Sequence, residues 1–353
     1  MNTARVQLFQ GSGQPFVPGN IPLPDNLAED EVLVAISLAT ICGSDLHTIE
    51  GRRTAPTPCV LGHEAVGHVV ASNRSGLVTG QRVTWSLADS CGECAPCTRW
   101  HVPQKCDHLF KYGHAAQSDG SGLNGCYASH ILLRRGTAIL PVPQALPDAV
   151  AAPANCALAT IANALGDLPD PCQSAVVQGG GLLGIYACAW LRHQGVETVF
   201  CTDVNPARLA LVREFGGLPL LASPDAWPEA AKQVLTASGG GVDLVVEVAG
   251  SGSVIKDGIA LLHPGGTYVW AGMVHPETPL DLTGEAVVRK CLTVRGVHNY
   301  APQHLAAALH FLVQKHGTLP FEKLVSPPLP LDRLNEAMAL SQQRGWLRVA
   351  VAP

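Results

Sequence analysis

The sequence predicts an α/β protein of two domains, in which a mostly-β region is followed by a doubly wound parallel sheet. Three observations support this prediction. The chain has 353 residues, which is too long for one ordinary core. About the first 140 residues consist of short β-like runs separated by turn residues. From Ser174 onward, strand-like and helix-like runs alternate, as in a parallel sheet covered by helices.

The expected elements follow from the hydrophobic pattern and the turn residues. In the first region we expect no long helix, and strands at residues 32–36, 64–70 and 82–85. In the second region we expect strands at residues 175–178, 198–202, 242–248 and 265–271. Helices are expected between the Gly-rich turn after residue 178 and residue 193, and over residues 206–215. The last region should contain helices over residues 304–314 and 331–341, a Pro-rich turn over 326–330 and a strand over 347–351.

Charge and hydropathy argue against nucleic-acid and membrane partners. The net charge is −5, and Lys and Arg residues are scattered rather than clustered. Residues 149–166 and 171–191 carry no charge. However, the first window contains Pro153 and Asn155 and the second contains three consecutive glycines, so both fit buried α/β segments better than membrane spans. Residues 1–10 lack the apolar core of a signal peptide, and we therefore expect a cytoplasmic protein.

A glycine-rich run after the strand at 175–178 fits a dinucleotide-binding turn. It satisfies G-x-G-x-x-G with Gly179, Gly180, Gly181, Leu182, Leu183 and Gly184. An apolar helix follows, so backbone N–H groups and the helix N-terminus can face a pyrophosphate. Asp203, after the next strand, can accept hydrogen bonds from the ribose hydroxyls, which favours NAD over NADP, and Arg208 could lie against the adenine. The alternative is an ordinary strand–turn–helix with a surface Asp.

Four cysteines fall within one short loop. They are Cys91, Cys94, Cys97 and Cys106. In a reducing compartment this spacing indicates a metal rather than disulfides. Four thiolates suit a closed, structural zinc site, which would give order to a loop with few apolar residues. An iron–sulfur cluster is the competing interpretation, although nothing else in the chain suggests electron transfer.

A second group of metal-ligand residues lies earlier in the chain. Cys42 is followed by Ser44, Asp45 and His47, and His63 is followed by Glu64. A thiolate, an imidazole and one further ligand could hold zinc with a position left open for a substrate oxygen. Taken singly, these residues could be a buried cysteine, a core histidine and a surface glutamate.

Together, these motifs resemble the zinc-containing medium-chain alcohol dehydrogenases over essentially the whole chain. The Gly-His-Glu run at 62–64, the run at 42–47 and the Ala-Pro-x-x-Cys-Ala run at 152–157 match family patterns. The resemblance implies a GroES-like catalytic domain over residues 1–157 and 298–353, with a structural-zinc lobe at about 88–108. It implies a Rossmann NAD-binding domain over residues 158–297.

The resemblance also implies roles for individual residues and two zinc ions per chain. Cys42, His63 and Cys156 would hold the catalytic zinc, with Glu64 as an occasional ligand or as a charge that tunes the site. Ser44 and His47 would pass the substrate proton to solvent by way of the cofactor ribose, and Asp45 would bind the far nitrogen of His63. The further cofactor contacts that the resemblance implies are Val248 and Ala271 beside the nicotinamide and Arg348 at a phosphate. One departure is that eight residues rather than seven separate Cys97 from Cys106.

The substrate is the least determined part of the prediction. The runs at 103–107, 111–114 and 149–156 resemble a branch associated with phosphonate catabolism. Arg53 and Lys111 fall where the family builds the walls of its cleft, so we expect a small polar alcohol with an anionic group, such as a hydroxyalkylphosphonate, and its aldehyde or ketone. The alternative is that both side chains simply face solvent. A homodimer or homotetramer is expected.

The same sequence leaves three alternative functions. A non-catalytic NAD- and zinc-binding redox sensor would keep the fold without the chemistry. A dehydrogenase of another polyol or amino alcohol would keep the zinc chemistry with a different substrate. A zinc-free quinone reductase of the same superfamily would lack Cys42, Cys156 and the four-cysteine lobe.

Overall fold

A computed structural model describes residues 2–274 and 278–353. The chain forms two compact units. Unit 1 comprises Met1–Ala159 and Tyr300–Pro353, and unit 2 comprises Thr160–Asn299. The domain boundaries expected from the sequence, after residues 157 and 297, each lie two residues earlier than those of the units. Each unit has its own sheets and its own apolar core.

Unit 1 is built on two sheets. The smaller sheet has the order β2 (Val17–Pro22), β1 (Thr3–Phe9) and β4 (Cys59–Val60). The larger sheet has the order β15 (Leu329–Pro330), β16 (Ala350–Ala352), β3 (Val32–Thr40), β5 (Glu64–Ser72), β6 (Arg82–Trp85) and β8 (Ile139–Pro141), and β7 (His130–Leu133) also pairs with β3. Apart from the parallel pair β15–β16, the paired strands of unit 1 are antiparallel. Strand β3 therefore lies at the centre, and its carboxyl end leads directly to Cys42.

The helices of unit 1 are short before residue 140, as the sequence predicts. Those before residue 140 are α1 (Gly43–Ile49) and α2 (Ala95–Thr98). After it, unit 1 contains α3 (Asp148–Ala151), α10 (Pro302–Lys315) and α11 (Leu334–Gln342). Its 3₁₀ turns are η1 (Pro103–Lys105), η2 (Ala152–Asn155), η5 (Phe321–Leu324) and η6 (Leu331–Arg333). The helix expected over 331–341 thus begins as a 3₁₀ turn and continues as α11. The expected strand over 347–351 is shorter and begins at Ala350. Arg348, just before it, forms an isolated parallel bridge with Val325 through backbone bonds to Leu324 and Ser326.

Unit 2 contains a six-stranded parallel sheet. Its order is β11 (Leu218–Leu221), β10 (Thr198–Asp203), β9 (Ser174–Gln178), β12 (Val242–Glu247), β13 (Leu262–Trp270) and β14 (Thr293–Gly296). The chain runs outward from β9 in one direction through β10 and β11, and in the other through β12 to β14. This order confirms the predicted doubly wound sheet, and it places the switch point of the topology between β9 and β12, where ligands bind such sheets.

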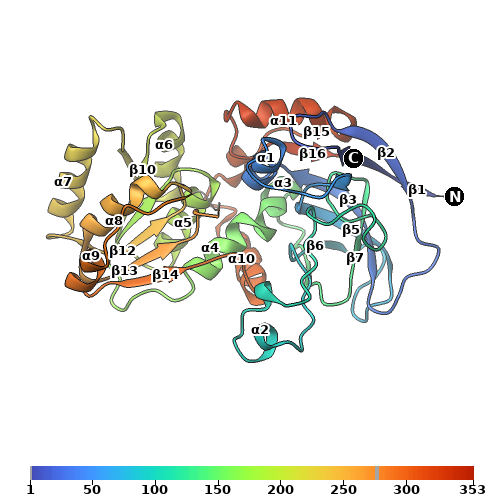
Figure 1. The fold of residues 1–353 in the computed structure, drawn as a ribbon, viewed down its shortest axis with the longest axis horizontal. Coiled ribbons are helices and arrows are strands. Elements are labelled where there is room, and N and C mark those ends of the chain that lie inside the picture. Colours follow the sequence, from blue (N-terminus) through green and yellow to red (C-terminus); the bar gives the residue numbers. More distant parts are fainter. Residues whose placement is uncertain (1, 275–277) are drawn as a thin grey trace. The chain divides into compact units, whose positions relative to one another are not determined.

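Helices flank the sheet of unit 2 (Figure 1). They are α5 (Leu182–His193), α6 (Pro206–Val212), α7 (Trp227–Ala237), α8 (Ile255–Leu261) and α9 (Gly284–Arg289), with 3₁₀ turns η3 (Arg213–Phe215) and η4 (Gly252–Val254), while α4 (Ala157–Ala164) leads from unit 1 into unit 2. One face of the sheet packs Val176, Phe200 and Val245 against α7 and α8. The helix expected over 206–215 tightens into a 3₁₀ turn after Val212 and ends at Gly216, whose φ is +83°.

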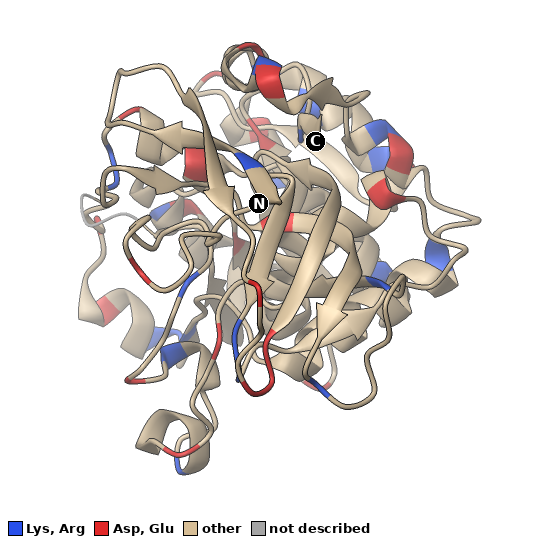
Figure 2. Cartoon of the chain, turned by 90° about the vertical axis from the view of Figure 1, so that its right-hand side faces the viewer, with Lys and Arg blue, Asp and Glu red and all other residues tan. Residues whose placement is uncertain are grey.

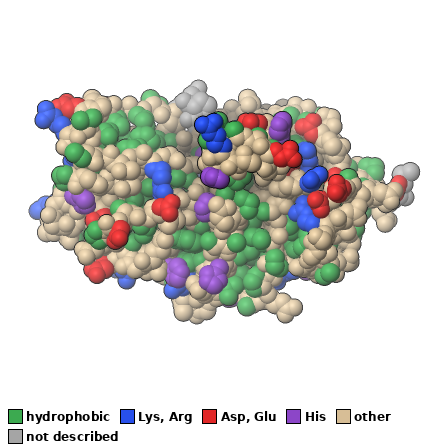
Figure 3. Space-filling view, turned by 90° about the horizontal axis from the view of Figure 1, so that it is seen from below, with side chains coloured by type: hydrophobic (Ala, Val, Ile, Leu, Met, Phe, Trp, Pro, Cys, Tyr) green, Lys and Arg blue, Asp and Glu red, His purple; other side chains and the backbone are tan. Residues whose placement is uncertain are grey.

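The surface agrees with the scattered charges of the sequence. Along the ribbon in Figure 2, Lys and Arg positions are interspersed with Asp and Glu positions. On the face drawn in Figure 3, the Lys and Arg side chains form no extended basic patch. Among the described residues, the structure contains no helix with the length and apolarity needed to cross a bilayer. The first uncharged window, residues 149–166, instead forms most of α3 and all of η2 and α4. The second window, residues 171–191, forms β9 and most of α5.

Candidate metal and dinucleotide sites

Three separate segments of unit 1 bring four metal-ligating side chains together. They are Cys42, His63, Glu64 and Cys156, which we call the buried cluster. One ligand atom from each lies within 4.8 Å of the others, and the two sulfurs are 3.9 Å apart. Cys42, His63 and Glu64 are buried, whereas Cys156 is half-buried. Two sulfurs, an imidazole nitrogen and a carboxylate are donors that fit zinc.

Local sequence explains how two of these ligands are placed. Cys42 caps α1, and its N–H donates to Oδ2 of Asp45 (3.0 Å), three residues later, in the manner of a capping box. His63 follows Gly62, whose φ is +88° and whose missing Cβ leaves room for the Tyr127 ring, because a Cβ there would lie 2.8 Å from a ring carbon. The Tyr127 hydroxyl donates to the same Asp45 oxygen at 2.8 Å. Asp45 therefore connects the N-cap of α1 with Tyr127, whose ring packs against Gly62, the residue before His63.

The contact between Asp45 and His63 is longer than the expected hydrogen bond. Oδ1 of Asp45 lies 3.6 Å from Nδ1 of His63, which is an ion-pair distance. Burial alone would lower the pKa of His63, but the charges of Asp45 and Cys42 raise it above its ordinary value. The hydrogen bond from the Cys156 thiol and the nearby Arg348 hold the pKa of Cys42 well below its usual range, although burial opposes this. The cluster thus favours a thiolate at Cys42.

Arg348 lies beside the buried cluster and pairs with Glu64. Its Nε and Nη2 donate to the two carboxylate oxygens at 2.8 and 2.9 Å, and Nη2 also lies 3.7 Å from Sγ of Cys42. The Thr40 hydroxyl donates to Glu64 at 2.6 Å. Burial raises the pKa of Glu64 to about 7 despite the guanidinium. These contacts place Arg348 in unit 1 as the counter-ion of Glu64, and its expected contact with a cofactor phosphate stays a prediction.

Ser44 and His47 lie on α1 beside the buried cluster. They are three residues apart, so their side chains lie on one face of the helix. Oγ of Ser44 is 3.5 Å from Nε2 of His63, and both Ser44 and His47 are half-buried. A hydroxyl next to the metal ligands and an imidazole one turn away are suited to carry a proton outward.

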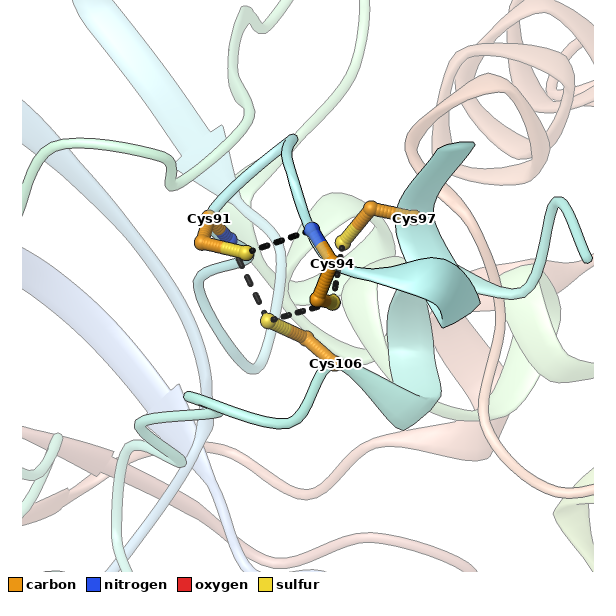
Figure 4. A group of neighbouring side chains, drawn as sticks. All are labelled: Cys91, Cys94, Cys97 and Cys106. Carbon is orange, nitrogen blue, oxygen red and sulfur yellow. Dashed lines mark hydrogen bonds between the residues drawn. The ribbon is translucent and has the colours of Figure 1, made fainter. Parts of the chain in front are cut away.

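The four lobe cysteines form a second cluster, which we call the lobe cluster. The sulfurs of Cys91, Cys94, Cys97 and Cys106 point toward one another (Figure 4). Sγ of Cys94 lies 3.4 Å from that of Cys97 and 3.7 Å from that of Cys106, so the eight-residue spacing keeps Cys106 in the cluster. N–H groups of Glu93 and Cys94 donate to Cys91, and these bonds lower the pKa of its thiol to about 6. The lobe cluster has the donors of a closed tetrahedral zinc site.

Two cations near the buried cluster, Arg53 and Lys111, make no close ion pair among the described residues. Arg53 follows α1, and Lys111 pairs its backbone with Ala88. Both side chains are half-buried, and within residues 2–274 and 278–353 neither makes a close ion pair with a carboxylate. Burial lowers the pKa of Arg53, although the more distant charges of Asp45, Cys42 and Cys156 act in the opposite direction. Burial and the charge of Arg53 lower the pKa of Lys111 to about 8, while Cys156 and Cys42 act in the opposite direction. The expected substrate cations are thus close to each other and to the buried cluster.

Of the two aromatic residues that follow Lys111, His114 lies beside the buried cluster, whereas Tyr112 lies in the core. The ring of His114 lies 5.4 Å from that of His63, and its Nδ1 is 2.9 Å from the Tyr112 carbonyl. Burial, together with His63 and Lys111, lowers the pKa of His114 well below its ordinary value. Tyr112 is fully buried, and its hydroxyl bonds to Thr137, so it belongs to the core.

The Gly-rich turn of unit 2 follows β9 at the switch point of the sheet. Gly179 has φ +111°, and a Cβ on Gly184 would lie 1.8 Å from the Gly179 carbonyl oxygen, so this turn requires glycine at both positions. Gly181 caps α5, and a Cβ there would meet nothing within 4 Å. The open space at Gly181, next to the first N–H groups of Leu182 and Leu183, fits a pyrophosphate.

Asp203 ends β10 beside this turn. Its Oδ2 accepts from the N–H of Gly180 and its Oδ1 from the N–H of Asn205, both at 2.8 Å. Arg208, on α6, places Nη1 3.6 Å from Oδ2. The carboxylate is therefore fixed at the end of β10, where it can meet an adenosine ribose.

The loops after β12 and β13 are held together by a carboxylate that the sequence analysis missed. Glu247 is fully buried and accepts from the N–H groups of Gly250 (2.6 Å) and Gly272 (3.0 Å). Its backbone carbonyl also accepts from Ala271. Glu247 thereby orders the loops that carry Val248 and Ala271, the residues expected beside the nicotinamide. Its position at the carboxyl end of a predicted strand was the available signal.

Three further residues support the buried cluster and were not predicted. Thr40, Tyr127 and Asn155 contact Glu64, Asp45 and the His63 carbonyl, respectively. Each lies far along the chain from the residue it supports. Hydrophobic periodicity and motif spacing do not reveal such contacts, because they depend on how the strands and loops of unit 1 pack.

Comparison with known proteins identifies the family of the chain. Residues 28–144 match the family described as "Alcohol dehydrogenase GroES-like domain", and residues 183–314 match the family described as "Zinc-binding dehydrogenase". The chain is 30% identical to geraniol dehydrogenase of Castellaniella defragrans, over 97% of this chain and 95% of that protein. It is 29% identical to L-threonine 3-dehydrogenase of Deinococcus radiodurans, over 82% and 80%. An alcohol dehydrogenase structure from Thermotoga maritima has a TM-score of 0.93 and 30% identity, and the match covers 100% of both chains.

Proposed function

The chain belongs to the zinc-binding alcohol dehydrogenases, and from that premise we propose that it transfers hydride between NAD and a small alcohol that carries an anionic group. The observation that carries the proposal is the pair of half-buried cations, Arg53 and Lys111, beside the four ligands of the buried cluster. Desolvating such cations is costly unless an anion compensates them. Because Cys42, Cys156 and the lobe cysteines are present, a zinc-free quinone reductase is disfavoured.

In this proposal the two clusters have different roles. Cys42, His63 and Cys156 would hold a catalytic zinc ion, and the lobe cluster would hold a structural one. A zinc ion held in the buried cluster would supply Lewis-acid chemistry, which would polarise the alcohol oxygen and lower the pKa of its hydroxyl. Glu64 is compensated by Arg348, so this carboxylate tunes the charge of the site without remaining an isolated buried anion.

The residues of α1 and unit 2 complete the proposed chemistry. Near His63, Ser44 would take up the substrate hydroxyl proton and release its own proton, which His47, one turn further along α1, would pass on to solvent. The Gly-rich turn holds the cofactor pyrophosphate, and Asp203 binds the ribose.

The charge of the site suggests a class of substrate. A guanidinium and an ammonium suit an oxyanion, and Arg can bind a phosphonate through two parallel hydrogen bonds. A hydroxyalkylphosphonate fits this pair, which agrees with the resemblance of residues 111–114 to the phosphonate-catabolism branch. Two of the relatives are named for alcohols of different charge: threonine carries a carboxylate, whereas geraniol is uncharged. An amino alcohol with a carboxylate is therefore the second candidate.

The substrate proposal is tested by kcat/KM with NAD for 2-hydroxyethylphosphonate, L-threonine and an uncharged alcohol of similar size. We expect the phosphonate to be preferred. Arg53→Ala and Lys111→Ala should each lower its kcat/KM by about 10- to 100-fold, the loss expected for a charged hydrogen bond. The control is Arg52→Ala, because Arg52 is exposed and already pairs with Glu50. Equal constants for charged and uncharged alcohols, or no loss in the Arg53 and Lys111 variants, would remove the anionic substrate.

The preference for NAD is tested separately at Asp203. Asp203→Ala should weaken NAD by about 10-fold or more, because ribose hydroxyls lose a charged acceptor, and should relieve the repulsion of a 2′-phosphate. The measurement is the ratio of kcat/KM for NAD and NADP, since general loosening of the Gly180 turn would affect both cofactors alike. Asp225→Ala, at an exposed position, is the control. An unmodified enzyme that already prefers NADP would contradict this assignment.

A further inference from the structure

Asn155 connects two ligands of the buried cluster. It directly precedes Cys156 and is fully buried. Its side-chain Nδ2 donates to the backbone carbonyl of His63 and to that of Trp85, both at 2.9 Å. One amide group therefore links η2, which leads to Cys156, with the turn that carries His63 and with the end of β6.

Tyr300 holds Asn155 from the other side. Its hydroxyl donates to the Asn155 carbonyl and accepts from the N–H of Leu87 (3.2 Å). Burial raises the pKa of Tyr300 well above its ordinary value, so the hydroxyl keeps its proton and remains a donor. Because the Asn155 carbonyl belongs to the peptide that leads into Cys156, this bond fixes the orientation of that peptide.

We propose that Asn155, supported by Tyr300, is a positioning residue that sets the distance between the zinc ligands Cys156 and His63. The two ligands come from segments far apart in the sequence, and Asn155 joins those segments directly. The inference rests on the proposed metal-ligand roles of Cys156 and His63. Groups that orient metal ligands in this way typically change metal affinity by about 10- to 100-fold when they are removed.

The test compares the zinc affinity of Asn155→Leu with that of a matched variant. Leucine has a similar size and cannot donate to the two carbonyls. The control is Asn124→Leu, because Asn124 is also buried and its Nδ2 donates to two backbone carbonyls, at 2.8 Å each, on another loop of unit 1. Zinc content is measured by metal analysis during competition with a chelator, and melting temperature is measured in parallel.

We expect Asn155→Leu to bind one of its two zinc ions about 10- to 100-fold more weakly and to lower kcat without changing KM for the cofactor. Asn124→Leu should bind both zinc ions with an affinity within twofold of that of the unmodified protein. This should hold even if its melting temperature falls by as much as that of Asn155→Leu. Tyr300→Phe, which removes only the hydroxyl, should shift zinc affinity in the same direction by a smaller factor, and it decides the question if Asn155→Leu does not fold. Unchanged zinc affinity in Asn155→Leu, or in Tyr300→Phe where that variant decides, would overturn the inference, as would an equal loss in Asn124→Leu. An unmodified protein that binds only the lobe zinc would contradict the proposed function instead.

Discussion

The two cysteine-containing clusters of unit 1 are built in opposite ways. The lobe cluster takes its four sulfurs from residues 91–106, and backbone N–H groups of the same loop bond to those sulfurs. The buried cluster takes its ligands from three segments and is surrounded by charged side chains, among them Arg348 and Asp45. One cluster organises a loop, whereas the other is organised by the fold around it.

Because of this difference, we expect the metal of the lobe cluster to matter mainly for stability and the metal of the buried cluster mainly for turnover. A metal in the lobe cluster replaces the apolar core that the loop lacks, so its removal should affect folding more than turnover. In the buried cluster, the ligands are already held by Asp45, Asn155 and Arg348, so its metal should affect turnover more than folding. Each prediction below tests one side of this contrast, starting from the largest expected effect.

Replacing a ligand of the buried cluster should abolish turnover while the fold persists. His63→Ala should lower kcat by about 1,000-fold or more, because zinc supplies several kcal/mol of charge stabilisation in the transition state. The variant should lose one zinc ion and still bind NAD, since the Gly-rich turn lies in unit 2. The measurements are kcat, metal content and NAD affinity. His68→Ala, at an exposed position on β5, is the control, and substantial activity in His63→Ala would refute the assignment.

Replacing a ligand of the lobe cluster should produce the opposite pattern. Cys94→Ser should lose the other zinc ion and lower the melting temperature by roughly 5–10 °C, the effect of releasing a tied loop of this length. Its kcat should fall much less than that of His63→Ala. Cys291→Ser serves as the control, because Cys291 is exposed and lies outside both clusters. A Cys94→Ser protein with unchanged zinc content and melting temperature would show that the lobe holds no structural metal.

The same contrast explains how much could be predicted from the sequence. The lobe cluster is local, so the spacing of its cysteines identified the complete set. The parallel sheet of unit 2 was predicted from the alternation of strand-like and helix-like runs and from the single Gly-rich turn after β9. Its short outer strands β11 and β14 were not predicted. Cys156 was joined to Cys42 and His63 through a family resemblance, because nothing in the spacing of these residues shows that they meet. The partners that hold the buried cluster, such as Thr40 and Asn155, depend on packing between distant segments and were not predicted.

The smallest expected effect is a pH dependence confined to the surroundings of the buried cluster. Burial and Arg53 lower the pKa of Lys111 to about 8, so Lys111 is positively charged below that pH and loses its charge above it. Affinity for an anionic substrate should therefore be present below pH 8 and decline above it, by up to about 10-fold. The phosphonate group of the substrate gains negative charge as the pH rises, so the substrate itself cannot cause the decline. The measurement is the ratio of kcat/KM for 2-hydroxyethylphosphonate and an uncharged alcohol between pH 7 and about 9.5, because the ratio cancels the titration of groups that serve both substrates.

Two variants of Lys111 make this pH prediction specific. Lys111→Arg should keep the phosphonate preference to higher pH, since a guanidinium stays protonated over the whole range. Lys111→Ala should give a low ratio that no longer varies with pH. Zinc in the lobe cluster should be retained throughout, because Lys111 does not contribute to that cluster. A ratio that stays constant across this range in the unmodified enzyme would mean that Lys111 does not contact the substrate anion. Of the two cations, only Arg53 would then remain as a contact for that anion.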